Sequence, residues 1–195
     1  MAPGVSSAAG MTDAGAAITS AREGVARGVA REVTRGLGAL NGPDAAGAHA
    51  ALRQCCASER WVSAMTAGRP YVSAETLFER AEAAFDELTR EDWLQAFAAH
   101  ARIGAPRPGD EQGASEQAGV ASASAEERGA LTAGNDRYEA RFGHVFLIRA
   151  RGLDGAQMLA ALRERLENPP ALELEIAAAQ QREITRQRLQ GLLAP

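Results

Sequence analysis

Apolar residues recur at helical spacing along most of this chain, and polar residues that can cap a helix stand directly before several apolar runs. The clearest run follows Ser73, where six apolar residues share one helical face: Leu77, Phe78, Ala81, Ala84, Phe85 and Leu88. Capping residues predict the starts of five helices: Asp44, Ser73, Thr89 with Asp92, Ser124 with Glu127, and Asp154 with Gln157. Each apolar face must be buried, so we expect these helices to pack against one another.

The second half of the chain adds a long helix, predicted from about Ala171 to Leu193 after the helix-breaking pair Pro169-Pro170. The stretch 142–148 is short and apolar and contains a glycine, so an extended segment and a helix both stay open. Residues 105–114 form a predicted polar loop, and patterns typical of β-strands are almost absent. We therefore predict an all-α protein, a single-domain helical bundle over residues 37–195.

Residues 1–36 are rich in Ala, Gly, Ser and Arg, and we expect a poorly ordered or loosely helical extension there. Their arginines and thin apolar stripe resemble an organelle transit peptide, while the simpler interpretation is a plain extension or a start at Met11. No apolar run approaches ~18 residues, so we expect no membrane span. The adjacent Cys55 and Cys56 offer no useful disulfide framework, which favours a reducing compartment and a cytoplasmic location.

The charge balance excludes several classes of function. The net charge is −4, so the chain lacks the basic excess that binding to nucleic-acid phosphates requires. All 21 basic residues are arginine, which excludes a lysine Schiff base with pyridoxal phosphate and a P-loop lysine.

His49, His100 and His144 are scattered, and no cysteine pair has ligand spacing, so we expect no metal site. The sequence gives no sign of a cofactor.

His100 is the first candidate for chemistry, because it lies where an amphipathic helical run ends and a polar loop begins. Carbonyl groups at a helix C-terminus favour a cationic imidazole, although a lone histidine is often structural. Glu116 follows the loop and is either an acid/base group or a plain surface carboxylate. Arg188 shares a helical face with Ile184 and Leu192, which turns it towards the core. There it needs a ligand or a salt bridge to an acid of a neighbouring helix.

Seven separated motifs form an ordered set along the chain. They are Phe97-Ala98-Ala99-His100-Ala101-Arg102-Ile103-Gly104, Glu116-Gln117, Asn135-Asp136-Arg137-Tyr138, Phe142-Gly143-His144-Val145-Phe146, Arg165-Leu166-Glu167-Asn168, Glu173, and Ile184-Thr185-Arg186-Gln187-Arg188-Leu189. With them, the stretch from about Leu37 to Leu193 resembles the OHCU decarboxylase family, the 2-oxo-4-hydroxy-4-carboxy-5-ureidoimidazoline decarboxylases of urate breakdown. Two departures are clear: family members usually carry proline after the histidine, where this chain has Ala101, and serine three residues before the glutamate, where it has Gly113.

The resemblance implies an all-helical lyase, commonly a homodimer, that needs no cofactor. Its substrate would be a small ureidoimidazoline, and its product (S)-allantoin. By the same resemblance, His100 transfers a proton at the 4-hydroxyl, and Glu116 is its acid/base partner and holds the histidine tautomer. Arg188 is expected to bind the carboxylate or a ring oxygen. The implied substrate-binding residues are Ala101, Gln117, Phe146, Leu147 and Ile148, the last three through their backbone.

Two other classes of function remain as alternatives. A catalytically inactive helical binding module could keep the same fold and use the N-terminal extension to contact a partner. A hydrolase of the amidohydrolase type, acting on ureides, is disfavoured. Its chemistry requires a cluster of metal ligands, and this sequence shows no such cluster.

Overall fold

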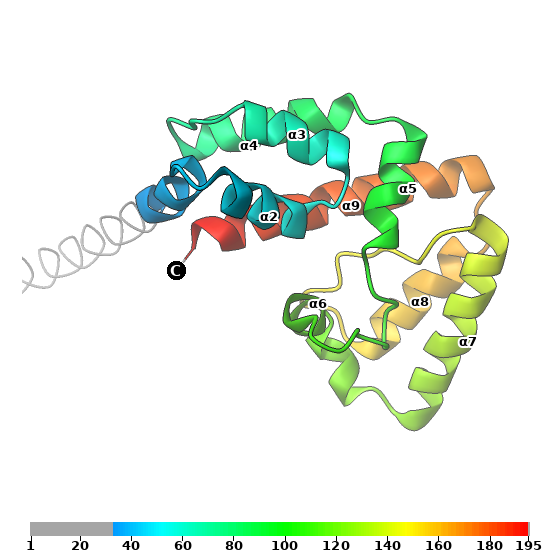
Figure 1. Cartoon of the computed structure of the whole chain (residues 1–195). Helices are drawn as coiled ribbons and strands as arrows, with labels where there is room; N and C mark the ends of the chain where they lie inside the picture. The colour runs from blue at the N-terminus through cyan, green and yellow to red at the C-terminus, as the bar shows by residue number, and fades with distance from the viewer. Residues whose placement is uncertain (1–32, 195) are drawn as a thin grey trace, which may run out of the picture.

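The computed structural model describes residues 33–194, and most of this range is helical (Figure 1). The helices are a segment over residues 33–41, α2 (Ala45–Cys55), α3 (Glu59–Ala67), α4 (Ala74–Asp86), α5 (Arg90–Ala98), α6 (Glu111–Glu116), the 3-10 helix η1 (Ala118–Ser122), α7 (Ala125–Phe142), α8 (Gly155–Arg165) and α9 (Pro170–Leu193). Outside the helices, the only pairing of extended backbone within this range is the isolated bridge between Arg102 and Ala105. The predicted all-α class is confirmed.

The predicted helix starts are confirmed by hydrogen bonds. In each of the five capping residues, the side chain accepts from the backbone N–H three residues further on: Asp44, Ser73, Thr89, Ser124 and Asp154. The last helix begins at Pro170, where the missing N–H of proline costs no helical bond.

The predicted loop 105–114 is wrong at its end, because Asp110 caps α6 there. Residues 145–150 have no helical structure, so the non-helical alternative for that stretch is correct.

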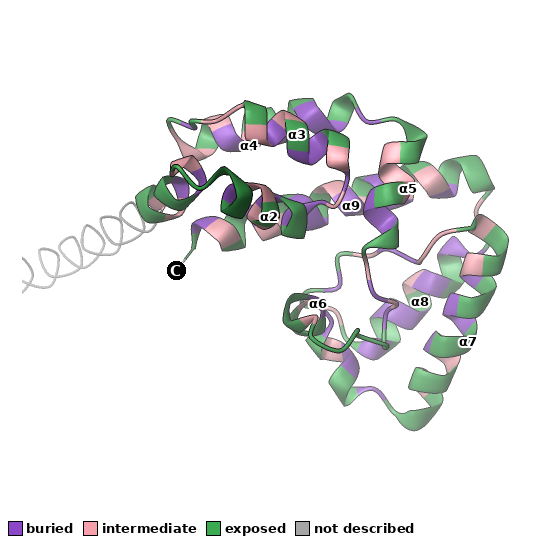
Figure 2. Ribbon diagram, viewed as in Figure 1, coloured by how far each residue is buried: buried purple, intermediate pink, exposed green. Residues whose placement is uncertain are grey.

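Two apolar cores lie on either side of the segment that follows α7 (Figure 2). The first core gathers side chains of α2, α3, α4, α5 and α9, with Trp61 and Phe97 fully buried. The second gathers side chains of η1, α7 and α8. Leu147 belongs to the first core and its neighbour Phe146 to the second, as expected for consecutive residues of an extended segment. This segment therefore joins the two cores.

The helical segment 33–41 packs against the end of α9. A Cβ atom at Gly36 would lie 2.6 Å from the Cα of Leu193, so only glycine allows this approach. The segment runs through the expected boundary at residue 36. The rest of the predicted extension, with its transit-peptide pattern and Met11, lies outside the described residues. None of the described helices is long and apolar enough to cross a bilayer.

Candidate active site

His100 stands directly after α5, where the chain passes from the first core to the second. The carbonyl groups of Ala98, Ala99 and His100 accept hydrogen bonds from the Arg107 guanidinium at 3.1, 2.7 and 3.0 Å. Arg107 thus already neutralises this helix end. Burial, and then the nearby Arg188 guanidinium, lowers the pKa of His100 from 6.5 to about 4. The expected cationic imidazole is therefore wrong, and His100 is neutral at pH 7.

Glu116, the last residue of α6, forms a two-pronged ion pair with Arg188 of α9. The Arg188 Nε and Nη2 atoms each lie 2.8 Å from a different carboxylate oxygen, and Nη1 donates to the carbonyl of Gln54 at 2.9 Å. Burial disfavours the charged form of Arg188, but the bonds to Glu116 outweigh it and raise the arginine pKa. The salt bridge that the sequence left open for Arg188 is present, and its partner is the other predicted acid/base residue.

The partner of the His100 ring is Gln181, not Glu116. His100 Nε2 lies 2.8 Å from Oε1 of Gln181, a residue of α9 with no exposed surface. The expectation that Glu116 holds the histidine tautomer is therefore wrong, because the carboxylate is occupied by Arg188.

Gln117 connects the site to the turn after His100. Its Oε1 accepts from the backbone N–H of Gly104 at 2.9 Å, and Gly104 has a φ of +84° that favours glycine. The NH₂ group of Gln117 donates to no acceptor among the residues described, so it is available to a ligand. This agrees with the hydrogen-bonding role that the resemblance implies for Gln117.

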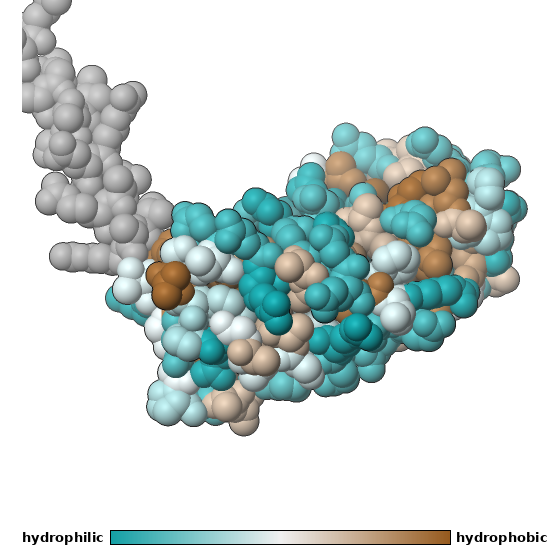
Figure 3. Space-filling view, turned by 90° about the horizontal axis from the view of Figure 1, so that it is seen from above, coloured by the Kyte–Doolittle hydropathy of each residue, from teal (hydrophilic) through white to brown (hydrophobic). Residues whose placement is uncertain are grey.

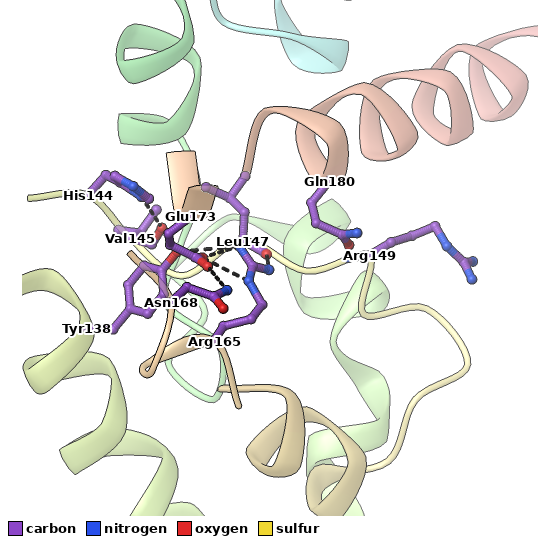
Figure 4. A network of polar contacts seen from close by, with 9 residues as sticks. All are labelled: Tyr138, His144, Val145, Leu147, Arg149, Arg165, Asn168, Glu173 and Gln180. Atoms are coloured by element: carbon purple, nitrogen blue, oxygen red, sulfur yellow. Dashed lines mark hydrogen bonds and ion pairs between the residues drawn. The ribbon is translucent and has the colours of Figure 1, made fainter. Parts of the chain in front are cut away.

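A buried polar network supports the segment Phe146–Ile148 (Figure 4). Arg165 of α8 donates to the carbonyl of Leu147 and forms an ion pair with Glu173 of α9. Next along the chain, the backbone N–H of Arg149 donates to Oε1 of Gln180 at 2.8 Å. Side chains of α8 and α9 thus hold the backbone of an irregular segment in one conformation.

His100, Glu116 and Arg188 lie where three cavities adjoin. His100 and Glu116 line the first, Glu116 and Arg188 the second, and His100 and Arg188 the third. The remaining predicted site residues all line the first cavity: Ala101, Gln117, Phe146, Leu147 and Ile148. The structure therefore brings the predicted residues together, although Arg188 lines the second and third cavities and not the first.

Sequence reasoning missed Gln181, Arg149 and Arg151. Both arginines line the first cavity, and neither guanidinium has a bonding partner within residues 33–194. Gln181 lies seven residues before Arg188, which is two helical turns and hence the same face. One turn back from Ile184 this face reaches both Gln180 and Gln181, so the helical spacing does not distinguish between them.

The other reactive residue types in the described chain give no second site. No group of three or more His, Cys, Asp or Glu residues within 33–194 is arranged to hold a metal ion. Cys55 and Cys56 are free and buried, and burial raises their thiol pKa values to about 12 and about 11. Such thiols are poor nucleophiles at neutral pH.

The known proteins to which this chain is similar include two that are named for urate degradation or for OHCU decarboxylation. A relative named uric acid degradation bifunctional protein TTL, from Arabidopsis thaliana, is 37% identical over an alignment of 147 residues that covers 72% of this chain and 45% of the relative. A 2-oxo-4-hydroxy-4-carboxy-5-ureidoimidazoline decarboxylase from Amia calva is 33% identical over 84 residues, which are 43% of this chain and 48% of the relative. The chain thus spans less than half the length of these two curated relatives.

Solved structures resemble this fold as well. The crystal structure of OHCU decarboxylase in the presence of (S)-allantoin matches with a TM-score of 0.64 and 35% identity, over 72% of this chain and 95% of that chain. An (S)-allantoin synthase matches with a TM-score of 0.61 and 18% identity, over 82% of this chain and 53% of that chain, and supports the fold alone. The family model described as OHCU decarboxylase matches residues 41–190, so this chain belongs to the OHCU decarboxylase family.

Proposed function

We propose that this chain is a lyase that removes CO₂ from 2-oxo-4-hydroxy-4-carboxy-5-ureidoimidazoline and forms (S)-allantoin. One observation carries the proposal: in a member of this family, His100, Glu116 and Arg188 lie together around three adjoining cavities. An inactive binding module gains no support, because both proton-transfer groups that the resemblance implies are present at the site.

The chemistry sets what the protein must supply. Breaking the bond between ring carbon C4 and its carboxylate leaves an electron pair, which the ring carbonyl and conjugated nitrogen of this substrate can delocalise. The reaction therefore needs no external electron sink. The protein must orient the carboxylate, accept the proton of the 4-hydroxyl, and return one proton to one face of the ring, because (S)-allantoin is a single enantiomer.

His100 suits the role of base, because a neutral imidazole has one unprotonated nitrogen. Glu116 lines the same cavity and is positioned there by its ion pair with Arg188, so it can take part in moving the proton. Arg188 uses three of its five N–H groups on Glu116 and Gln54, which leaves two for the substrate carboxylate. The guanidinium groups of Arg149 and Arg151 add positive charge that attracts an anionic substrate.

A coupled assay tests this function. Urate is oxidised by a uricase and the product is hydrolysed, then this protein is added and (S)-allantoin is followed by circular dichroism. We expect the optical signal to rise faster than in the spontaneous decay, and to be unaffected by EDTA. A signal no faster than the spontaneous decay would contradict the proposal.

We also propose that the chain forms a homodimer in the cytoplasm. The family resemblance supports the dimer, and the two free, buried cysteines are compatible with a reducing compartment. Light scattering on the purified chain would give twice the monomer mass of 20.4 kDa if the dimer forms, and the monomer mass if it does not.

A further inference from the structure

Gln181 and Thr185 form a hydrogen-bonded chain that ends on the His100 ring. Both lie on α9, one turn apart, with exposed fractions of 0% and 3%. The Thr185 hydroxyl lies 2.8 Å from the backbone carbonyl of Gln181, and the Gln181 Nε2 lies 3.1 Å from the same hydroxyl oxygen. The other end of the amide, Oε1, lies 2.8 Å from His100 Nε2.

The positions of the hydrogens follow from these contacts. A carbonyl has no hydrogen, so the bond between Thr185 and the Gln181 carbonyl must use the hydroxyl hydrogen of Thr185. The Thr185 oxygen then has only lone pairs for the Gln181 side chain, which must present its NH₂ group. The amide oxygen therefore faces His100, and an oxygen there can only accept.

We propose that Gln181 and Thr185 are positioning residues that hold neutral His100 in the tautomer with hydrogen on Nε2 and leave Nδ1 as the base. This deepens the proposed function and rests on it, because it names the nitrogen that accepts the substrate proton. The Nδ1 atom has no hydrogen-bond partner in residues 33–194, in keeping with this assignment. Because the orienting group is a neutral amide, the ring is aligned without a second buried charge beside it.

The charged groups that act on His100 are Arg188 on α9, Glu116 on α6, and Asp110 at the start of α6. None of them bonds to the His100 ring in the described structure, so the Gln181 contact alone fixes which nitrogen carries the hydrogen. The test variants leave all three charges in place.

The test reads the tautomer and the turnover of the full chain together. Nitrogen-15 NMR of the histidine rings near pH 7.5 identifies the protonated nitrogen, with the His100 signals assigned by their loss in His100→Asn. In the wild type we expect the tautomer with hydrogen on Nε2. In Gln181→Leu we expect a shift towards the other tautomer, and a turnover reduced by about 10- to 100-fold. Gln190→Leu, at an exposed glutamine of the same helix, should change neither.

A second pair of variants keeps the test decisive if Gln181→Leu fails to fold. Thr185→Val removes the hydroxyl that orients the amide and should disturb the tautomer and the rate, whereas Thr185→Ser should restore both. A wild type with hydrogen on Nδ1, or a folded Gln181→Leu or Thr185→Val variant with normal tautomer and turnover, would overturn the inference. An inactive wild type would overturn the proposed function instead, while its spectrum would still decide the tautomer.

Discussion

Two arginine–glutamate pairs at low exposure join α9 to other helices, and their surroundings differ. Arg165 of α8 pairs with Glu173, with side-chain exposures of 10% and 0%. Arg188 pairs with Glu116 of α6, with exposures of 14% and 12%. Much of the surface in view is hydrophilic (Figure 3). In the other ion pairs among residues 33–194, every side chain is at least 27% exposed, so these two pairs are unusually well covered. Arg188 and Glu116 are 72 residues apart in the sequence, whereas Arg165 and Glu173 are eight apart.

The Arg165 cluster is closed, whereas the Arg188 cluster is open. Glu173 also accepts from Tyr138 and from Asn168, and Arg165 also donates to the Leu147 carbonyl, as Figure 4 shows. By contrast, Arg188 has two unused N–H groups and adjoins two cavities. A closed polar cluster can only hold its surroundings in shape, while an open one can bind a substrate as well.

The largest effect is expected from breaking the closed pair. Glu173→Ala leaves Arg165 buried without a counter-charge and frees Tyr138 and Asn168. We expect the free energy of unfolding to fall by about 3–5 kcal/mol, measured by urea denaturation. Glu183→Ala, at an exposed position of the same helix, is the control and should change it little. A loss below about 1 kcal/mol would mean that this cluster does not hold the fold together.

Acid should weaken the fold through the buried ring of His100. The unfolded chain protonates His100 below pH 6.5, but the folded protein does so only near pH 4. Between these values the unfolded state binds more protons, so the free energy of unfolding decreases as the pH falls, by about 3 kcal/mol from this group. His144, whose pKa burial also lowers, acts in the same direction. Urea denaturation at pH 7 and pH 4.5 should show a smaller loss in His100→Asn, and equal losses would contradict the neutral imidazole.

Changing Arg188 should affect function more than folding. Arg188→Lys keeps the charge but loses the planar fork, so we expect KM to rise about tenfold, the effect of one charged hydrogen bond. The free energy of unfolding should fall by only about 1–3 kcal/mol, because water can reach Glu116 from the cavities. Arg186→Lys, on an exposed position of α9, is the matched control. If Arg188→Lys binds substrate normally but unfolds like Glu173→Ala, Arg188 belongs with the closed cluster.

The smallest effect is expected at Ala101. Its backbone N–H donates to no acceptor in the described chain, so Ala101→Pro removes no hydrogen bond. Proline would reduce the entropy of the unfolded chain and stabilise the fold by about 0.4–1 kcal/mol. Thermal unfolding measures this, and a lower midpoint would show that the turn after His100 differs from one that accepts proline.

The helices could be predicted from the sequence because their determinants are local. A cap such as Ser124 and its partner Glu127 are three residues apart, and the apolar face of α4 repeats within one helix. The charge state of His100 could not be predicted in this way. It depends first on the burial of the ring, then on Arg188, 88 positions along the chain, and on Arg107, which binds the carbonyl groups at the helix end.

The candidate site shows the same limit. Motif resemblance identified His100, Glu116 and Arg188, but not that the last two pair with each other across 72 residues. Nor did it identify Gln181, 81 residues from His100, because a glutamine beside another glutamine carries no local signal.

The most direct test of the central claim is the rate of (S)-allantoin formation by His100→Asn, compared with wild type and with His49→Asn at a histidine whose side chain is 41% exposed. Asparagine keeps some hydrogen bonding but cannot act as an acid or base near pH 7. We predict that turnover falls by about 10²–10⁴-fold in His100→Asn, while His49→Asn is unchanged and both variants stay folded. A folded His100→Asn variant that forms (S)-allantoin at the wild-type rate would contradict the catalytic role of His100.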